Sequence, residues 1–186
     1  MCAHKFISKN IQRIHMATIT TTEAANIQKL VVSMFNLAPT AALYNDMVTS
    51  YEGAANSLSV LATNLSASGV YINSISGLDN AALSSKLMTN LGLSTGTTAG
   101  DAASDYFLAR LAAGVTLAQV AVEAVTYLTN DAQRNAAFDT TAQLLTNKAT
   151  VAQALIDSGI VAATTADLDY VSAVTSDTAT VTTATT

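Results

Sequence analysis

Four aspartates are the residues of this chain whose spacing could hold a cation or move a proton. Asp101 and Asp105 form one pair, and Asp167 and Asp169 form another. Paired carboxylates can perform acid–base catalysis or bind Ca²⁺ through their oxygens. Both pairs, however, fall at the predicted starts of helices, where negative charge is favoured by about 0.3–1 kcal/mol. Helix capping is therefore the favoured interpretation, with calcium binding as the alternative.

Other reactive groups are confined to the N-terminal end. From Met16 onward the chain has no cysteine and no histidine, which removes thiol nucleophiles, imidazole bases and most zinc sites. His4 and His15 lie in a polar tail, where solvated side chains are more typical than a metal or haem site. The glycine-rich loop 92–100 lacks the Gly-Lys-Ser/Thr of a phosphate-binding loop and follows a predicted helix, not a strand. We therefore expect no enzyme activity.

The composition predicts a helical protein with a surface that is easily desolvated. Of the 186 residues, 50% are hydrophobic and 11% are charged, whereas about 25% are charged in a typical soluble domain. Small apolar residues let helices pack closely, and Thr, Ser, Asn and Ala are left for the surface. Such a surface suits a protein that contacts copies of itself; the alternative is a surface that is simply poor in lysine.

The charge distribution excludes several partners. From Met16 onward there are five basic and 13 acidic residues, and an acidic body repels phosphate backbones, so we expect no nucleic-acid binding. No run approaches the roughly 18 apolar residues of a membrane span. The lack of cysteine after residue 15 excludes internal disulfides and is common in proteins that are secreted unfolded.

The N-terminal segment is predicted to lie outside the folded domain. Residues 1–15 are basic without the apolar region of a signal peptide. Met16-Ala17-Thr18 resembles a more natural start, so residues 1–15 are expected to be an upstream extension or a disordered tail. We place a disordered or extended segment at 1–19, the helical domain at 20–174 and a Thr-rich tail at 175–186.

A helical hairpin between Gly114 and Gly159 is expected to organise the chain. Its first helix has one apolar stripe, formed by Leu117, Val120, Ala121, Ala124, Val125 and Leu128. Thr116 and Gln119 are spaced as a capping box at its start. After a turn at 129–131, a second periodic run ends at Gly159. We expect Leu128 and Leu144 to lie in the core.

Shorter helices are predicted before and after the hairpin. Their start or stop signals are Thr20 with Glu23, Pro39, Thr40, Gly53, Ser57, Gly69, Asp79, Gly92 and Asp101. The segment 70–75 is ambiguous between a strand and a helical turn, and 167–174 is expected to be a last short helix. Seven or eight short helices joined by brief polar turns predict an all-α single domain. The six tyrosines are spaced as core or interface anchors.

A weak internal repeat is also present. Residues 34–37 (Met-Phe-Asn-Leu) and 88–91 (Met-Thr-Asn-Leu) are 54 positions apart, and 57–62 is similar to 116–121 at an offset of 59. An insertion in the loop 92–100 would account for the difference between the two offsets.

Two parts of the chain resemble a known family. Residues 87–93 (LMTNLGL) and 105–120 (DYFLARLAAGVTLAQV) resemble an α-helical repeat common in secreted bacterial surface proteins, with Phe107 where that repeat often has Trp. Residues 138–152 (FDTTAQLLTNKATVA) with 174–184 (VTSDTATVTTA) are similar to a segment of large type I-secreted proteins, surface-layer proteins among them. In this second segment Thr178 replaces the usual proline.

The resemblance implies a structural role outside the cell, export without a cleaved signal and, in many members, calcium dependence. The chain has no Gly-Asp nonapeptide repeat of the calcium-binding kind. Residues 157–186 contain no basic residue and end in Thr, Ala and Val, as C-terminal type I secretion signals do. We expect this tail to be loosely held and unable to form a core.

These observations favour an extracellular, secreted, non-enzymatic protein that self-assembles into a surface layer, filament or matrix. The expected partner is the chain itself, without a cofactor. The alternative is a module that binds cell-surface polysaccharide through exposed Tyr and Asn side chains. A third hypothesis is a cytoplasmic helical accessory protein.

Overall fold

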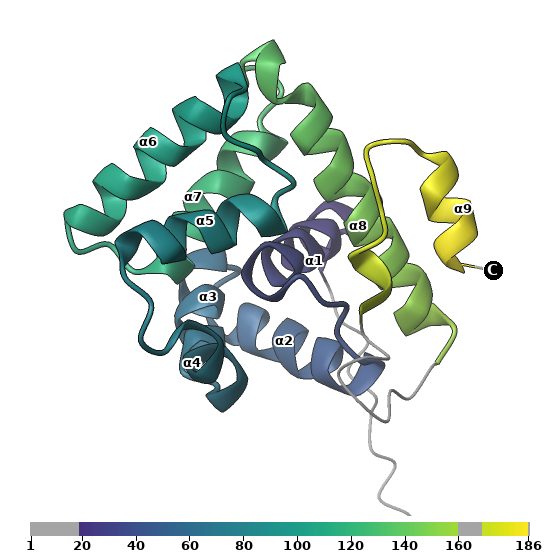
Figure 1. Cartoon of the computed structure of the whole chain (residues 1–186). Coiled ribbons are helices and arrows are strands. Elements are labelled where there is room, and N and C mark those ends of the chain that lie inside the picture. The colour runs from purple at the N-terminus through teal and green to yellow at the C-terminus, as the bar shows by residue number, and fades with distance from the viewer. Residues whose placement is uncertain (1–18, 160–168, 186) are drawn as a thin grey trace, which may run out of the picture.

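Helix α1 (Thr21–Phe35) lies at the centre of the fold, where it contacts α2, α3, α5, α7 and α8 (Figure 1). It begins at the predicted capping box: the Glu23 N–H donates to Thr20 Oγ1 at 3.2 Å, and the Thr20 N–H donates to Glu23 Oε2 at 2.8 Å. Ile27 and Leu30 on this helix have no solvent-exposed surface. Each fully buried aliphatic side chain contributes about 1.5–3 kcal/mol, so burial of α1 makes a large contribution to core packing.

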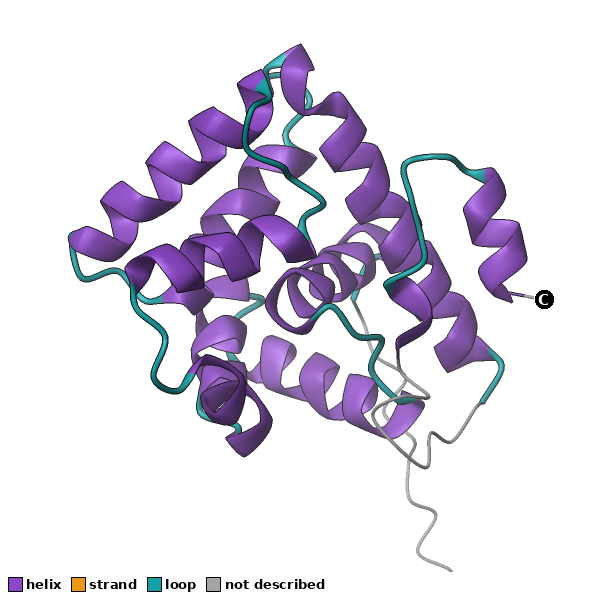
Figure 2. Ribbon diagram, in the orientation of Figure 1, coloured by secondary structure: helices purple, strands orange, loops and turns teal. Residues whose placement is uncertain are grey.

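The computed structural model describes residues 19–159 and 169–185, which are helical without any strand (Figure 2). The elements after α1 are α2 (Ala41–Gly53), α3 (Leu58–Ser66), α4 (Gly69–Ile75), α5 (Asn80–Asn90), α6 (Thr98–Ala112), α7 (Leu117–Thr129), the 3₁₀ helix η1 (Ala136–Phe138), α8 (Asp139–Asp157) and α9 (Ala179–Thr185). One continuous apolar core joins them. The predicted all-α single domain is confirmed.

Both helices of the predicted hairpin are present, but they do not organise the fold by packing on each other. Helices α7 and α8 each pack more extensively on α1 than on one another. The predicted stripe of α7 is buried along its whole length. Leu128 lies in the core as expected, whereas Leu144 is only half-buried and its neighbour Leu145 is 1% exposed. The expectation that Leu144 lies in the core is therefore wrong, and the adjacent Leu145 occupies that core position together with Thr141 and Val151.

Local capping signals were the most accurate part of the prediction. The side chains of Thr40, Ser57, Asp79 and Thr116 each accept a hydrogen bond from a backbone N–H in the first turn of α2, α3, α5 and α7. Gln119 does not complete a capping box. Instead its side-chain amide bonds to Ser59 and Thr63 on α3 and ties α7 to that helix.

Two segments differ from the prediction near residue 70. Helix α3 ends at Ser66, and Gly69 begins α4 instead of closing α3. The ambiguous segment 70–75 is helical because Ser68 provides an N-cap, accepting from the Tyr71 N–H at 3.3 Å. Tyr71 then anchors this short helix in the core, where its side chain is 2% exposed.

The C-terminal segment has more structure than its composition predicts. Val171 and Val174 are buried in the core, and α9 packs on α8. The Asn147 side chain donates to the Thr175 carbonyl at 2.8 Å, which fixes the chain between these two elements. Within 175–185 the chain forms α9, which was not predicted, but none of the side chains described over 175–184 is buried, as expected for a segment that forms no core. Of the predicted helix 167–174, residues 167 and 168 lie outside the described residues, and 169–171 form a single 3₁₀ turn.

Within the described residues, none of the helices has the length and apolar character needed to cross a membrane.

Candidate functional site

Of the four aspartates proposed as calcium ligands, the three that the structure describes (Asp101, Asp105 and Asp169) belong to no metal-binding cluster of described side chains. Helix α6 begins at Thr98 with Thr97 as its N-cap, three residues earlier than predicted. Asp101 lies in the first turn, where its Oδ1 accepts from the Gly96 N–H at 2.8 Å. Asp105 lies further along the helix, beyond the free N–H groups, and is exposed. The capping interpretation therefore applies to Asp101 and is wrong for Asp105.

The second aspartate pair is only partly described. Asp169 is exposed in the 3₁₀ turn before Val171, and Asp167 lies outside the described residues. In the part of the chain that the structure describes, no three His, Cys, Asp or Glu side chains lie close enough together to hold a metal ion. Calcium binding through Asp167 and Asp169 stays a prediction.

A buried lysine joins three helices. Lys148 on α8 is 4% exposed. Its Nζ donates to Asn36 Oδ1 at 2.6 Å and to the Asn90 carbonyl at 3.1 Å. Asn36 is the left-handed C-cap of α1, and Asn90 is the last residue of α5. Lys148 therefore places positive charge at two helix C-termini, where the helix dipoles are negative.

The hydrogen bonds of Lys148 also bring together the two segments of the internal repeat, 34–37 and 88–91. Asn36 and Asn90 are the equivalent asparagines of the two repeated segments, and the Asn90 amide donates to the Ser33 carbonyl at 2.8 Å. Burial lowers the pKa of Lys148, and the charge of Asp169 opposes that change. With its ammonium directed at helix ends inside the core, Lys148 has a structural role.

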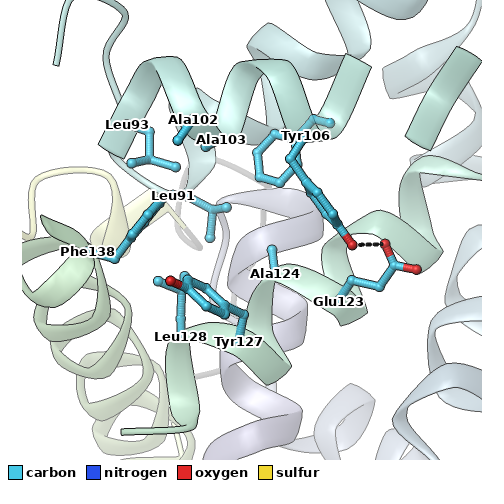
Figure 3. A pocket seen from close by; sticks show the side chains of 11 residues that line it. Leu91, Leu93, Ala102, Ala103, Tyr106, Glu123, Ala124, Tyr127, Leu128 and Phe138 are labelled. Atoms are coloured by element: carbon cyan, nitrogen blue, oxygen red, sulfur yellow. Dashed lines mark hydrogen bonds between the residues drawn. The ribbon is translucent and has the colours of Figure 1, made fainter. Parts of the chain in front are cut away.

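An apolar pocket lies between α6 and α7, and we call it the α6–α7 pocket. Its volume is about 280 Å³. The lining comes from the loop after α5, from α6, from α7 and from η1 (Figure 3), and comprises Leu91, Leu93, Ala102, Ala103, Tyr106, Phe107, Glu123, Ala124, Tyr127, Leu128 and Phe138. The rings of Tyr127 and Phe138 meet edge to face at 5.4 Å between centroids.

The polar groups of the α6–α7 pocket are already paired within the protein. Tyr106 Oη donates to Glu123 Oε2 at 2.9 Å, and the Arg110 Nε–H donates to the same oxygen at 2.9 Å. The hydrogen bonds from Arg110 hold the pKa of Glu123 below its usual value, so this carboxylate is ionised at neutral pH. Tyr127 Oη accepts from the Asn135 N–H at 2.9 Å. The pocket can therefore bind an apolar group and contains no group poised for acid–base chemistry.

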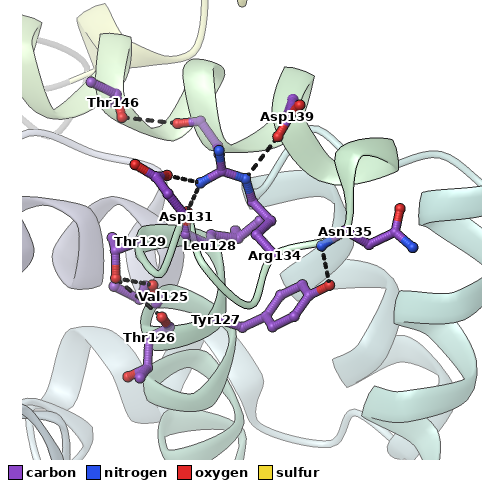
Figure 4. Close-up of polar contacts among 11 residues, drawn as sticks. Val125, Thr126, Tyr127, Leu128, Thr129, Asp131, Arg134, Asn135, Asp139 and Thr146 are labelled. Atoms are coloured by element: carbon purple, nitrogen blue, oxygen red, sulfur yellow. Dashed lines mark hydrogen bonds and ion pairs between the residues drawn. The ribbon is translucent and has the colours of Figure 1, made fainter.

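One wall of the α6–α7 pocket is fixed by the connection between α7 and α8, which is longer than the predicted turn at 129–131. Arg134 on this connection donates to three groups (Figure 4): the Leu128 carbonyl of α7 at 2.7 Å, Asp131 Oδ1 of the connection at 2.6 Å and Asp139 Oδ1 at the start of α8 at 2.9 Å. Charge-assisted hydrogen bonds of this kind are stronger than neutral ones. They hold η1, and with it Phe138, against the end of α7.

No family model, curated protein or solved structure matches this chain. The assignment of a site therefore rests on the geometry of the molecule itself.

Exposed aliphatic side chains on α3, α4 and the turn that follows are a second candidate for binding. Residues 53–78 contain no charged residue. Four large aliphatic side chains of this segment are exposed, namely Val60 (43%), Val70 (60%), Ile72 (50%) and Leu78 (38%). We call these four residues the α3–α4 aliphatic surface. Uncharged, exposed and aliphatic side chains are the type that protein interfaces bury at their centre.

The sequence predicted neither of these features as a site. The tyrosines were expected to be core or interface anchors, and of those that line the pocket Tyr106 is 47% exposed. The pocket depends on how far α6 stands from α7 and on where η1 places Phe138, and no periodicity encodes either distance. The charge-free run 53–78, in contrast, is visible in the sequence and could have identified the α3–α4 aliphatic surface.

Proposed function

We propose that this chain is a non-enzymatic structural protein that works outside the cell and assembles with copies of itself. A surface layer, a filament or a matrix would be the product. The observation that carries the proposal is the α3–α4 aliphatic surface, which exposes Val60, Val70, Ile72 and Leu78 on a charge-free segment. Extracellular location rests on the resemblance to surface-layer and type I-secreted proteins and on the composition of residues 157–186.

Burying this surface is energetically favourable. Removing apolar area from water contributes about 25 cal/mol per Å². Desolvating a charged side chain opposes association, and the segment 53–78 has none to desolvate. A surface that is poor in charge, on a chain with 11% charged residues, is therefore well suited to contacts between identical copies.

The residue types support a structural role over catalysis. Glu123 and Asp139 are engaged in ion pairs with arginine. Glu23 and Asp79 cap helices. The α6–α7 pocket also fits the polysaccharide alternative poorly, because its two tyrosine hydroxyls are already hydrogen-bonded and few polar atoms remain for sugar hydroxyls.

The test is the association state of the purified chain. Sedimentation velocity over a concentration series, with negative-stain microscopy of the same samples, should show species that grow with concentration. The double variant Val70→Asp/Ile72→Asp places two charges on the α3–α4 aliphatic surface and should remain monomeric. The control variant Ser85→Asp/Thr150→Asp adds the same charge at exposed polar positions on α5 and α8 and should assemble as the wild type does.

Calcium is included in the same series. A wild-type chain that stays monomeric at every concentration, with and without calcium, contradicts the proposed function. Assembly that needs calcium would instead direct attention to Asp167 and Asp169.

A further inference from the structure

We propose that the α6–α7 pocket of one copy receives helix α4 of the next copy, so that the chains join head to tail. This inference rests on the proposed self-association and names the two surfaces that meet. A single contact of this kind would bury both the exposed aliphatic side chains of α4 and the apolar lining of the pocket.

The sizes of the two surfaces are compatible. A cavity of about 150 Å³ holds a benzene molecule, which has six carbons. The α6–α7 pocket, at about 280 Å³, therefore has room for aliphatic side chains such as those of Val70 and Ile72.

The anchoring of α4 presents these side chains to a partner. Tyr71 is buried, and successive residues of a helix are about 100° apart, so Val70 and Ile72 project from opposite flanks of the short helix. One of them enters the pocket, and the other packs at the rim on the ring of Tyr106, which is 47% exposed.

The charges of the two surfaces are also compatible. Among the residues that line the α6–α7 pocket, Glu123 alone is charged, and it is already bonded to Arg110 and Tyr106. Helix α4 and its flanks carry no charge. Docking therefore buries no unpaired ion, which is the main electrostatic penalty of an interface.

The placement of the two surfaces determines the type of assembly. The pocket is lined by the first half of α6 and the second half of α7. The start of α6 and the end of α7 lie near the top of Figure 1, and α4 lies at the lower left. A copy therefore cannot fill its pocket with its own α4. Because each contact leaves one free pocket and one free α4, the contact is heterologous and generates open chains unless the rotation closes a ring. A seven-residue helix in a single pocket is a small interface, so assembly should be weak and steeply dependent on concentration.

The test uses two variants that each retain one of the two surfaces. Val70→Asp/Ile72→Asp keeps the pocket and loses α4 as a ligand. Ala102→Phe fills the pocket from an exposed position on α6, so that the core is spared, and keeps α4. Ala109→Phe adds the same ring at an exposed position of α6 that does not line the pocket, and it serves as the matched control. Circular dichroism checks that every variant is folded, and Ala102→Asp, which places an unpaired charge in the lining, is a second pocket variant.

Each of the two variants alone should lose assembly and sediment as a monomer, and Ala109→Phe should assemble like the wild type. An equimolar mixture of the α4 variant and the pocket variant should form a 1:1 dimer and nothing longer, because only one productive contact remains. Pocket variants that assemble normally, or a mixture that stays monomeric, overturn the head-to-tail contact while leaving self-association intact. A wild-type chain that never assembles overturns both proposals.

Discussion

Tyr71 holds a hydroxyl in the core that has no hydrogen-bond partner among the described residues. Its ring packs edge to face on Phe35 at 5.7 Å between centroids. A buried polar group without a partner costs about 1–3 kcal/mol, yet the ring anchors α4 and so presents Val70 and Ile72 to solvent. The hydroxyl is therefore expendable for stability, whereas the ring is not.

Tyr71→Phe should keep the ring contact and raise stability at neutral pH by up to about 1 kcal/mol. Burial raises the pKa of Tyr71 from 10 to about 12. Below pH 10 the Tyr71 hydroxyl is neutral in both the folded and the unfolded chain, so the free energy of unfolding does not depend on its ionisation. Between pH 10 and 12 the hydroxyl ionises in the unfolded chain but not in the folded chain, and the free energy of unfolding falls. The loss is about 3 kcal/mol for a two-unit difference.

Chemical denaturation at a series of pH values measures this difference between wild type and Tyr71→Phe. The wild type should lose stability relative to the variant between pH 10 and 12. Tyr170→Phe, at a tyrosine that is 42% exposed, is the control and should follow the wild type. Parallel curves for wild type and Tyr71→Phe would contradict the prediction.

Lys148 is the opposite case, a buried charge with partners. Lys148→Met removes the donor to Asn36 Oδ1 and the Asn90 carbonyl. An acceptor left unpaired in the core costs about 1–3 kcal/mol, and relief of the ammonium's desolvation offsets part of this. We expect a net loss of about 1–3 kcal/mol in the free energy of unfolding. Lys86→Met on α5, where the lysine is not fully buried, should change stability little.

The lowered pKa of Lys148 gives this prediction a pH dependence. Above the folded-state pKa and below the ordinary value of 10.5, the unfolded chain binds more protons than the folded chain. Wild-type stability therefore rises with pH in this window, and the gap to Lys148→Met should widen. Thermal unfolding at neutral and alkaline pH tests it, and a variant as stable as the wild type would show that the lysine contact is not needed.

At the scale of the helices, local signals were predictable and long-range packing was not. The caps at Thr20, Thr40, Ser57 and Asp79 depend on a few adjacent residues, and the structure confirms each of them. The central position of α1 depends on which helix the others surround, and periodicity shows only that a helix has an apolar face. The strongly amphipathic α7 was therefore given the organising role that α1 has.

Helix α8 provides a matched pair of leucines to test its register. Leu145 is 1% exposed, and Leu145→Ala should cost about 2–5 kcal/mol because it leaves a cavity. Leu144 is half-buried beside Gly92, so Leu144→Ala should cost clearly less, under about 2 kcal/mol. Urea denaturation of both variants measures the difference. Equal losses would contradict the register that the structure gives to α8.

At the scale of the whole molecule, the candidate surfaces arise from the arrangement of helices. The sequence predicted an easily desolvated surface in general terms but did not identify where it lies. It also placed the calcium candidates at helix starts, which is right for Asp101 and wrong for Asp105, because Thr97 caps α6 one turn before the predicted start. Lys148, whose burial depends on two distant helix ends, had no local signal beyond its place in the resemblance.

The C-terminal segment contributes Val171 and Val174 to the core. Two truncations separate this contribution to stability from the proposed role in export. Removing residues 170–186 takes Val171 and Val174 out of the core and leaves the buried Asn147 amide without the Thr175 carbonyl. Two buried valines contribute about 1.5–3 kcal/mol each, so we expect a loss of about 3–6 kcal/mol. Residues 179–184 contain no buried side chain, so removing only residues 179–186 should cost much less.

Thermal unfolding of the two truncated chains measures the folding role, and their extracellular levels measure export. If residues 179–186 belong to a C-terminal secretion signal, the shorter truncation should be folded yet accumulate inside the cell. The longer truncation cannot test export alone, because its loss of core side chains destabilises the domain. Equal stability of both truncated chains would contradict the contribution of Val171 and Val174 to stability. Normal extracellular levels of the folded shorter truncation would place any export signal outside residues 179–186.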